Sequence, residues 1–362
     1  MACICSIGTS LPEYQKTQDE VKQLVETIFP RPTREKQRLL QVFDHANISK
    51  RQFVVPEQWF TEDHSFAERN KIYQHEAIKH SIKAMDHCLT NEYFVEEPIT
   101  YEAIDAIFFI SSTGLATPSI DAYLMNERHF REDVVRIPIW GLGCAGGVSA
   151  MARAHDWLQA NPTKTALIVS VELCSLTFQK NDTSKSNFVG TALFGDGIAA
   201  MLVAGSESSN RKYIKGPSPQ ITKTSSHLQK NTLDVMGWDI ANTGFEVIFA
   251  KSIPKLVETL WKQHVTQFLR TTDIQLDELQ FFIAHPGGTK VLQAMEDALN
   301  KSKDTFRFSY QVLNDHGNMS SVTVFHVLKR VMEQRIQPGV QTIVSALGPG
   351  FSSELLSLEW SD

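Results

Sequence analysis

The chain has 362 residues, of which 42% are hydrophobic and 21% are charged, so it can bury a sizeable core and extensive disorder is excluded. Its 35 basic and 41 acidic side chains give a net charge of −6, which argues against general affinity for nucleic acid. The five cysteines are odd in number and unevenly spaced, which indicates free thiols in a reducing cytoplasm rather than a disulfide framework.

The N-terminal region predicts a strand followed by charged helices. Residues 1–8 are apolar but short and lack a basic leader, so they predict a first strand rather than a signal peptide. Residues 34–43 and 73–88 carry apolar side chains at helical spacing and predict helices that cover a core. Because no run of about 18 apolar residues occurs anywhere in the sequence, no transmembrane segment is expected.

The middle of the chain predicts a sheet that is buried on both faces. Three short apolar runs predict its strands, and a helical stretch separates the first two. These elements are the strands at residues 106–110, 165–171 and 197–203 and the helix at residues 148–159.

The second half repeats a similar order of elements, which suggests an internally duplicated fold. A break rich in Ser, Asn, Lys and Pro at residues 205–230 divides the chain into predicted domains 1–210 and 211–362. The predicted elements after the break are helices at 247–268, 289–299 and 322–333 and strands at 279–284 and 342–347.

Cys144 lies in a glycine-rich segment, residues 141–147, that predicts a tight turn from a strand into a helix. The glycines let a substrate approach the backbone. The following helix N-terminus favours a thiolate, and nearby N–H groups suit an oxyanion. The alternative is a cysteine buried in a glycine turn without any chemistry.

His285 and Asn318 are the two candidate partners of Cys144. His285 ends a predicted strand, where α/β folds place reactive groups, and imidazole is the usual partner of a thiolate. Asn318 precedes a predicted helix, so its amide either donates to a developing enolate or simply starts that helix. His285 has a similar alternative as a residue that caps a loop, and His316 is a rival base. The histidines show no spacing typical of a metal site.

Five segments together resemble one family in order and in spacing. They are Gly143-Cys144-Ala145-Gly146-Gly147, Phe194-Gly195-Asp196-Gly197, His285-Pro286-Gly287-Gly288, Gly317-Asn318-Met319-Ser320-Ser321 and Gly348-Pro349-Gly350. The match extends from Ile4 to Leu358 and is to type III polyketide synthases, the chalcone-synthase-like enzymes of the thiolase superfamily. Residues 171–176 resemble the bacterial members, and among these the sequence is most similar to enzymes that make alkylpyrones from fatty acyl-CoA.

The resemblance implies an α/β protein with the thiolase-like, duplicated, five-layered αβαβα fold, present as a homodimer. Cys144, in the N-terminal half, would take the starter acyl group from its CoA thioester. His285, in the C-terminal half, would hold Cys144 as a thiolate and, with Asn318, stabilise the enolate formed when malonyl-CoA loses CO2. The CoA thioesters are substrates, and neither a cofactor nor a metal is implied.

The resemblance also implies residues that bind substrate. Phe194 would lie where the CoA tunnel meets the cavity, and the small side chains of Ser112, Cys174 and Thr177 would line a tunnel for a long acyl tail. Further substrate contacts are implied at Ser320, Gly287, Gly288, Gly348, Pro349 and Gly350.

Two regions depart from the pattern of the family. Where plant relatives carry a basic trio for the CoA phosphates, this sequence has Arg38, Gln41 and His45, so we expect the phosphates at Arg38, Lys50 and Arg51. Residues 113–118 match the loop that crosses to the partner subunit, with Thr117 in place of the usual methionine.

Two alternatives to a polyketide synthase remain at this point. A 3-oxoacyl-acyl-carrier-protein synthase III uses the same Cys-His-Asn chemistry, but its acceptor is carried by a protein and it stops after one condensation. A non-catalytic acyl-CoA-binding protein would not need the three reactive residues that the chain retains. Incubation with acyl-CoA and malonyl-CoA alone distinguishes the three.

Overall fold

The structure, a computed structural model, describes residues 1–29 and 33–362 and, for residues 33–36 and 38, the backbone alone. Within the described chain nine strands form one mixed sheet in the order β11-β12-β13-β8-β1-β7-β6-β4-β5. These strands are β1 (Ala2–Ser10), β4 (Ala106–Ile110), β5 (Val135–Ile139), β6 (Thr165–Leu173), β7 (Asp196–Ala204), β8 (Ser218–Leu228), β11 (Ile283–Ala284), β12 (Gln341–Gly348) and β13 (Ser352–Ser361).

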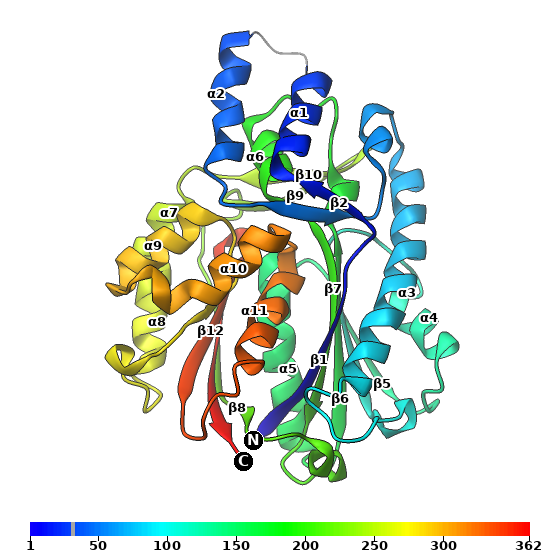
Figure 1. Cartoon of the computed structure of the whole chain (residues 1–362), viewed down its shortest axis with the longest axis vertical. Coiled ribbons are helices and arrows are strands. Elements are labelled where there is room, and N and C mark those ends of the chain that lie inside the picture. Colours follow the sequence, from blue (N-terminus) through cyan, green and yellow to red (C-terminus); the bar gives the residue numbers. More distant parts are fainter. Residues whose placement is uncertain (30–32) are drawn as a thin grey trace.

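The sheet and its helices form five layers (Figure 1). Helix α3 (Phe66–Thr90) packs on β1, β7 and β6, and α8 (Lys262–Leu269) packs on β13 at the opposite side. Between the two halves of the sheet lie α5 (Gly146–Ala160) and α11 (Thr323–Met332), which contact strands of both halves. This confirms the predicted five-layered α/β architecture, with one addition: the two halves of the sheet join where β1 pairs with β8.

The two central helices pack closely together because glycines begin α5. A side chain at Gly147 would meet the backbone oxygen of Ser321 at 2.3 Å, and one at Gly146 would meet Ile110 at 2.8 Å. Close packing at these glycines therefore brings the segment that precedes α5 against residues 318–321, which precede α11. Residues 144 and 318 are neighbours for this reason, although 174 residues separate them along the chain.

Other helices surround this frame, and a two-stranded pair lies at the end of β1 that is remote from the N-terminus (Figure 1). The pair consists of β2 (Tyr14–Thr17) and β3 (Lys50–Phe53). The remaining α-helices are α1 (Gln18–Ile28), α2 (Thr33–Asp44), α4 (Ile120–Glu127), α6 (Lys185–Leu193), α7 (Ile253–Leu256), α9 (Thr289–Leu299) and α10 (Arg307–His316).

Two predictions for the second half were wrong at their edges. The helix expected at 247–268 begins only at Ile253, because residues 244–249 form β10 (Gly244–Phe249), paired with β9 (Met236–Ala241) in a hairpin. The strand expected at 279–284 keeps only Ile283 and Ala284 in the ladder, because the backbone of Phe282 turns aside and donates to the Thr305 carbonyl.

The break predicted at 205–230 was also partly wrong, because it contains β8. This strand pairs with β13 and β1 inside the large sheet, although only its first four residues are buried. The predicted domain boundary at residue 210 falls in the short helix η5 (Ser209–Tyr213), between β7 and β8, and the division into 1–210 and 211–362 stays a prediction.

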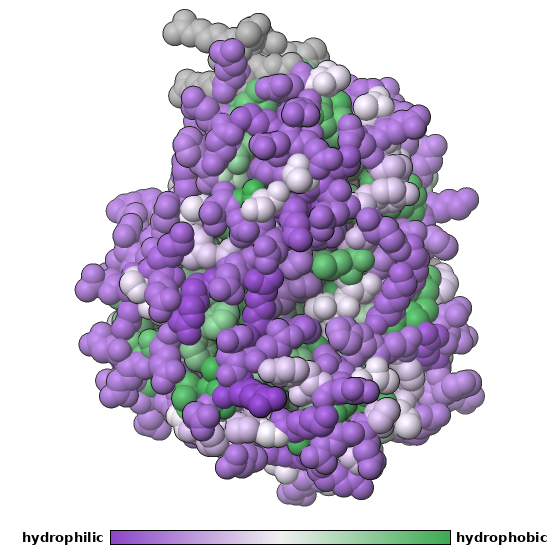
Figure 2. All heavy atoms as spheres, viewed as in Figure 1, coloured by the Kyte–Doolittle hydropathy of each residue, from purple (hydrophilic) through white to green (hydrophobic). Residues whose placement is uncertain are grey.

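The surface drawn in Figure 2 is mainly hydrophilic, with hydrophobic residues scattered in small groups on that face. Among the helices of the described chain, none combines the length and the apolar character that a bilayer crossing requires.

Candidate active site

Cys144 occupies the strand-to-helix turn that its glycines predict. The turn follows β5, and Cys144 lies in the short helix η3 (Gly143–Ala145) directly before α5. Gly143 has φ +45°, and a side chain there would meet the Pro349 ring at 2.9 Å, so both the backbone and the neighbouring loop require glycine. The result is a buried sulfur at the end of a fixed turn.

Cys144, His285 and Asn318 line one cavity of about 740 Å³. The Cys144 Sγ donates to the Ser320 hydroxyl at 3.5 Å and weakly to the Asn318 Oδ1 at 4.0 Å. Neither ring nitrogen of the buried His285 has a hydrogen-bond partner among the described residues. The fold thus places together the three groups that the sequence singled out, and the imidazole is available to a substrate.

Backbone contacts fix the two partners of the cysteine. The His285 N–H donates to the Ser345 carbonyl of β12 at 2.8 Å, directly after β11. The Asn318 N–H donates to the Leu193 carbonyl at 2.8 Å, and its Oδ1 accepts from the Ser320 N–H at 2.8 Å. The Asn318 Nδ2 donates to the Gly287 carbonyl at 3.3 Å, which uses one of its two hydrogens and leaves the other for a ligand.

Burial sets the resting protonation of the pair. It raises the pKa of the Cys144 thiol to about 11 and lowers the pKa of His285 to about 3. Desolvation therefore opposes the thiolate that the helix N-terminus is expected to favour. Both groups are neutral at pH 7, so a thiolate forms when the proton moves from Cys144 to a base.

A buried carboxyl group supports the turn from behind. Glu172 accepts from the Ser112 N–H at 3.0 Å and from the Ser321 hydroxyl at 2.5 Å, and burial raises its pKa to about 7. The Ser112 hydroxyl in turn accepts from the Gly143 N–H at 3.0 Å. Ser112 was predicted to line a tunnel, but its hydrogen bonds place it behind the nucleophile turn, where it supports Cys144.

Cys174, Thr177 and Phe194 line a second, smaller cavity of about 40 Å³ rather than the one that contains Cys144. Helix α1 contributes apolar side chains to this small cavity, among them Val21 and Val25. Phe194 also packs beside the large cavity, because its ring centroid lies 5.6 Å from that of Phe249, which lines that cavity.

The predicted glycine and proline contacts separate into two groups. Gly287 and Gly288 line the large cavity, as expected for a substrate channel. Gly348 and Pro349 pack instead against the turn of Cys144, where a side chain at Gly348 would meet Ala145 at 2.6 Å. Gly350, with φ +64°, faces Leu228 and Leu233 instead, and none of these three residues lines the large cavity.

The prediction that Arg51 contacts the CoA phosphates was wrong. Arg51 is 0% exposed, and its guanidinium donates to protein oxygens in the interior. Lys50 is half-buried in β3 and does not line the cavity, and the side chain of Arg38 lies outside the described residues.

The structure places Gln41 and His45, two of the residues aligned with the basic trio of the family, at the large cavity. Sequence reasoning missed three further basic side chains that line it, Lys185, Lys251 and Lys290, all exposed. Lys290 follows the 285–288 segment by two residues, and this proximity was the available signal. The other lysines reach the cavity through the fold and carry no local motif.

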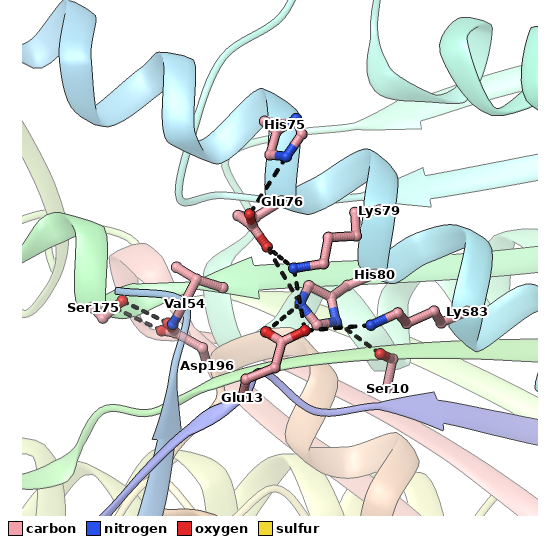
Figure 3. Close-up of polar contacts among 10 residues, drawn as sticks. All are labelled: Ser10, Glu13, Val54, His75, Glu76, Lys79, His80, Lys83, Ser175 and Asp196. Atoms are coloured by element: carbon pink, nitrogen blue, oxygen red, sulfur yellow. Dashed lines mark hydrogen bonds and ion pairs between the residues drawn. The ribbon is translucent and has the colours of Figure 1, made fainter. Parts of the chain in front are cut away.

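One group of described residues has the spacing of metal ligands (Figure 3). The His80 Nε2 lies 3.5 Å from a Glu13 oxygen and 3.4 Å from a Glu76 oxygen. The Lys79 ammonium lies 3.2 Å and 2.9 Å from oxygens of the same two carboxylates, and Lys83 lies 3.4 Å from Glu13. The two ammonium groups compensate the acidic charge, so the group is an ion-pair network that ties α3 to the segment before β2.

A cavity with a buried cysteine, a histidine and an asparagine, carried by a five-layered α/β fold, defines a condensing enzyme of the thiolase type. The family model "Chalcone and stilbene synthases, N-terminal domain" matches residues 1–207, and the model for the C-terminal domain matches residues 220–359. The chain therefore belongs to the chalcone and stilbene synthase family and is a type III polyketide synthase.

Individual relatives agree with this assignment. A putative chalcone synthase of Bacillus subtilis is 46% identical over 361 residues, 99% of each chain. A 1,3,6,8-tetrahydroxynaphthalene synthase of Streptomyces peucetius is 33% identical over 99% of this chain and 93% of its own. The crystal structure of such a synthase from Streptomyces coelicolor, a bacterial type III polyketide synthase, superposes with a TM-score of 0.91 at 29% identity over 99% of both chains.

Proposed function

We propose that this protein condenses a long-chain acyl-CoA starter with malonyl-CoA and cyclises the product to an alkylpyrone. The observation that carries the proposal is the meeting of Cys144, His285 and Asn318 at one cavity. The chemistry uses the energy of the thioesters, so we propose that it requires no cofactor.

Loading of the starter is an exchange of thioesters at Cys144. His285, neutral at rest, takes the proton of the thiol as the sulfur attacks the acyl-CoA carbonyl carbon. The new Sγ–C bond forms, the bond to the CoA sulfur breaks, and the imidazolium returns the proton to the departing CoA thiolate. The acyl group remains on Cys144, and His285 is neutral again.

Extension uses His285 again, now together with Asn318. Malonyl-CoA loses CO2, and the electron pair of the broken C–C bond becomes an enolate, whose oxygen accepts hydrogen bonds from the His285 ring N–H and the Asn318 Nδ2. The enolate carbon attacks the Cys144 thioester, a C–C bond forms, and the thiolate leaves. The extended chain is now a CoA thioester, so a second extension begins when the Cys144 sulfur attacks its carbonyl carbon and CoA leaves, as in loading. After two extensions the chain is again a CoA thioester, and an enol oxygen attacks its carbonyl carbon, which closes a pyrone and releases CoA.

The lining of the small cavity supports a long acyl tail. The small cavity is lined by apolar residues of α1 and by the small side chains of Cys174 and Thr177, and it lies behind Phe194. With a volume of about 40 Å³ it accepts a long tail only when the Phe, Leu and Val side chains around it move apart.

The basic residues at the large cavity support a revised site for the CoA phosphates. We propose that Lys185, Lys251 and Lys290 hold the phosphates and take the place of Arg51. Lys185 and Lys290 lie in the first turns of α6 and α9, where the backbone N–H groups add to the attraction for an anion.

The buried, free thiols of the chain support the proposed cytoplasmic location.

A homodimer is proposed from the free edge of β5. Within the described residues this strand pairs with β4 on one side only, and exposed apolar residues lie near it: Val135 is 43% exposed, Trp140 49% and Leu115 40%. Light scattering should give twice the mass of one chain, and Trp140→Asp should shift the protein toward the monomer because it places a charge in the interface. A monomeric wild-type protein would contradict the proposal.

The proposed function is tested by incubating the protein with malonyl-CoA and a series of acyl-CoA starters, with products identified by mass spectrometry. We expect triketide alkylpyrones from long-chain starters without any carrier protein. Condensation only with malonyl groups on a carrier protein would instead show a 3-oxoacyl-carrier-protein synthase, and binding of acyl-CoA without turnover would show a binding protein.

Cys174→Phe should shorten the accepted starter. The added ring fills the small cavity, so we expect kcat/KM for long-chain acyl-CoA to fall about 10-fold to 100-fold, which corresponds to ~1–3 kcal/mol of lost tail binding. Short starters serve as the internal control and should react within about threefold of the wild-type rate, as expected for unchanged chemistry. An unchanged preference for long chains would remove Cys174 from the acyl site.

A further inference from the structure

Arg51 lies in the interior of the protein and is hydrogen-bonded to the segment that ends at Phe194. It is fully buried, and its Nη1 donates to the Thr191 carbonyl at 2.6 Å and to the Phe194 carbonyl at 2.8 Å. Its Nη2 donates to the Gln18 Oε1 at 2.7 Å. A buried guanidinium is costly unless several oxygens satisfy it, and here two of those oxygens belong to the segment that ends at Phe194.

The stem of Arg51 also packs against the segment of Asn318. A side chain at Gly317 would lie 2.8 Å from the Arg51 Cδ, and one at Gly195 would lie 3.4 Å from the Arg51 Cβ. The two segments are bonded to each other, because the Gly195 N–H donates to the Asn318 carbonyl at 3.0 Å. Arg51 therefore lies where the loops of Phe194 and Asn318 cross.

Asp196 is the nearby carboxyl group, and burial raises its pKa to about 7 while the charge of Arg51 opposes this effect. It follows Phe194 by two residues, and its carboxylate accepts from the Val54 N–H at 2.8 Å and from the Ser175 N–H at 2.7 Å (Figure 3). Burial lowers the pKa of Arg51, and the charge of Asp196 opposes this effect. The carboxylate thus favours a charged guanidinium at a place that water does not reach.

We propose that Arg51 is a positioning residue for the decarboxylation of malonyl-CoA: it fixes the Phe194 ring and the Asn318 amide relative to each other at the cavity. The proposal rests on the proposed function, in which Asn318 stabilises the enolate of malonyl-CoA, and on the place that the family resemblance implies for Phe194, where the CoA tunnel meets the cavity. Hydrogen-bond donors stabilise a developing charge only when they are held in place before the reaction, so loosening the crossing lowers the rate.

Two reactions at the same cavity separate positioning from folding. The first is malonyl-CoA decarboxylation without a starter, which uses Phe194, His285 and Asn318. The second is alkylation of Cys144 by iodoacetamide, which reports the nucleophile turn, held by Ser112 and Pro349 and not by Arg51. We expect Arg51→Met to lower the kcat of decarboxylation about 100-fold while alkylation stays within about threefold, and Arg51→Lys to lose about 10-fold.

Arg69→Met is the matched control. Arg69 is also buried, and its Nη1 donates to the Leu176 carbonyl at 2.9 Å and to the Phe178 carbonyl at 2.8 Å, but it contacts neither crossing loop. Its loss should lower thermal stability while the kcat of decarboxylation per folded molecule stays within about threefold. If Arg51→Met does not fold, Gln18→Leu leaves Arg51 in place, removes one acceptor and should lower the same kcat about threefold to 10-fold.

The proposal is overturned if decarboxylation and alkylation fall together with the folded fraction. It is equally overturned if both Arg51→Lys and Gln18→Leu decarboxylate at the wild-type rate. A wild-type protein that does not decarboxylate malonyl-CoA would contradict the proposed function, and this proposal with it. When the wild-type protein decarboxylates malonyl-CoA, the proposed function stands, and the rate of Arg51→Met then tests the positioning role alone.

Discussion

Cys144→Ala should abolish condensation while malonyl-CoA decarboxylation continues. Without the sulfur no acyl-enzyme forms, so we expect the rate of pyrone formation to fall at least about 10⁴-fold, as for other lost nucleophiles. His285, Asn318 and Phe194 stay in place, so decarboxylation should remain within about 10-fold of the wild-type rate. Product analysis and CO2 release, measured on the same samples, check both halves of the prediction.

Cys88→Ala provides the control for the loss of a buried thiol. Cys88 lies in α3, and its Sγ donates to the Ser6 carbonyl at 3.5 Å. It does not line the large cavity of Cys144. We expect a loss of stability of about 1 kcal/mol and full condensation. Near-normal chain extension by Cys144→Ala would show that the acyl group is carried elsewhere.

The parts of this protein that the sequence predicts best are those that local rules determine. The strand at residues 106–110 and the helix at residues 289–299 have the predicted bounds, because an uninterrupted apolar run and a helical apolar pattern each bury one continuous surface. The turn of Cys144 was also predictable, since Gly143 must adopt a positive φ and accept Pro349 at close range.

The parts that the sequence does not predict depend on pairing and burial across the fold. β8 is polar along most of its length, and it is a strand because β13 and β1 flank it. Arg51 is basic and lies near a family phosphate site, so sequence reasoning placed it at the ligand, whereas Gln18 and the Phe194 segment enclose it. The small cavity depends on α1, whose amphipathic pattern does not reveal what its apolar face covers.

His285→Ala should slow both half-reactions, unlike Cys144→Ala. The imidazole is the base for the thiol and a donor to the enolate, so we expect losses of about 100-fold to 1000-fold in starter loading and in decarboxylation. The unassisted thiol, with its pKa raised to about 11, should be alkylated by iodoacetamide at a rate that rises about tenfold per pH unit between pH 7 and pH 10. The wild-type protein should react at least about 10-fold faster at pH 7, because His285 accepts the proton.

His316→Gln distinguishes the two candidate bases. The His316 Nδ1 lies 3.0 Å from the Gln52 Oε1 and its ring packs on His326, and it does not line the cavity of Cys144. Glutamine retains a hydrogen-bonding group beside Gln52, so loading, decarboxylation and alkylation should stay within about threefold of wild type. If His316→Gln loses the activities and His285→Ala retains them, the roles of the two histidines must be exchanged, and the free ring nitrogens of His285 would need another explanation.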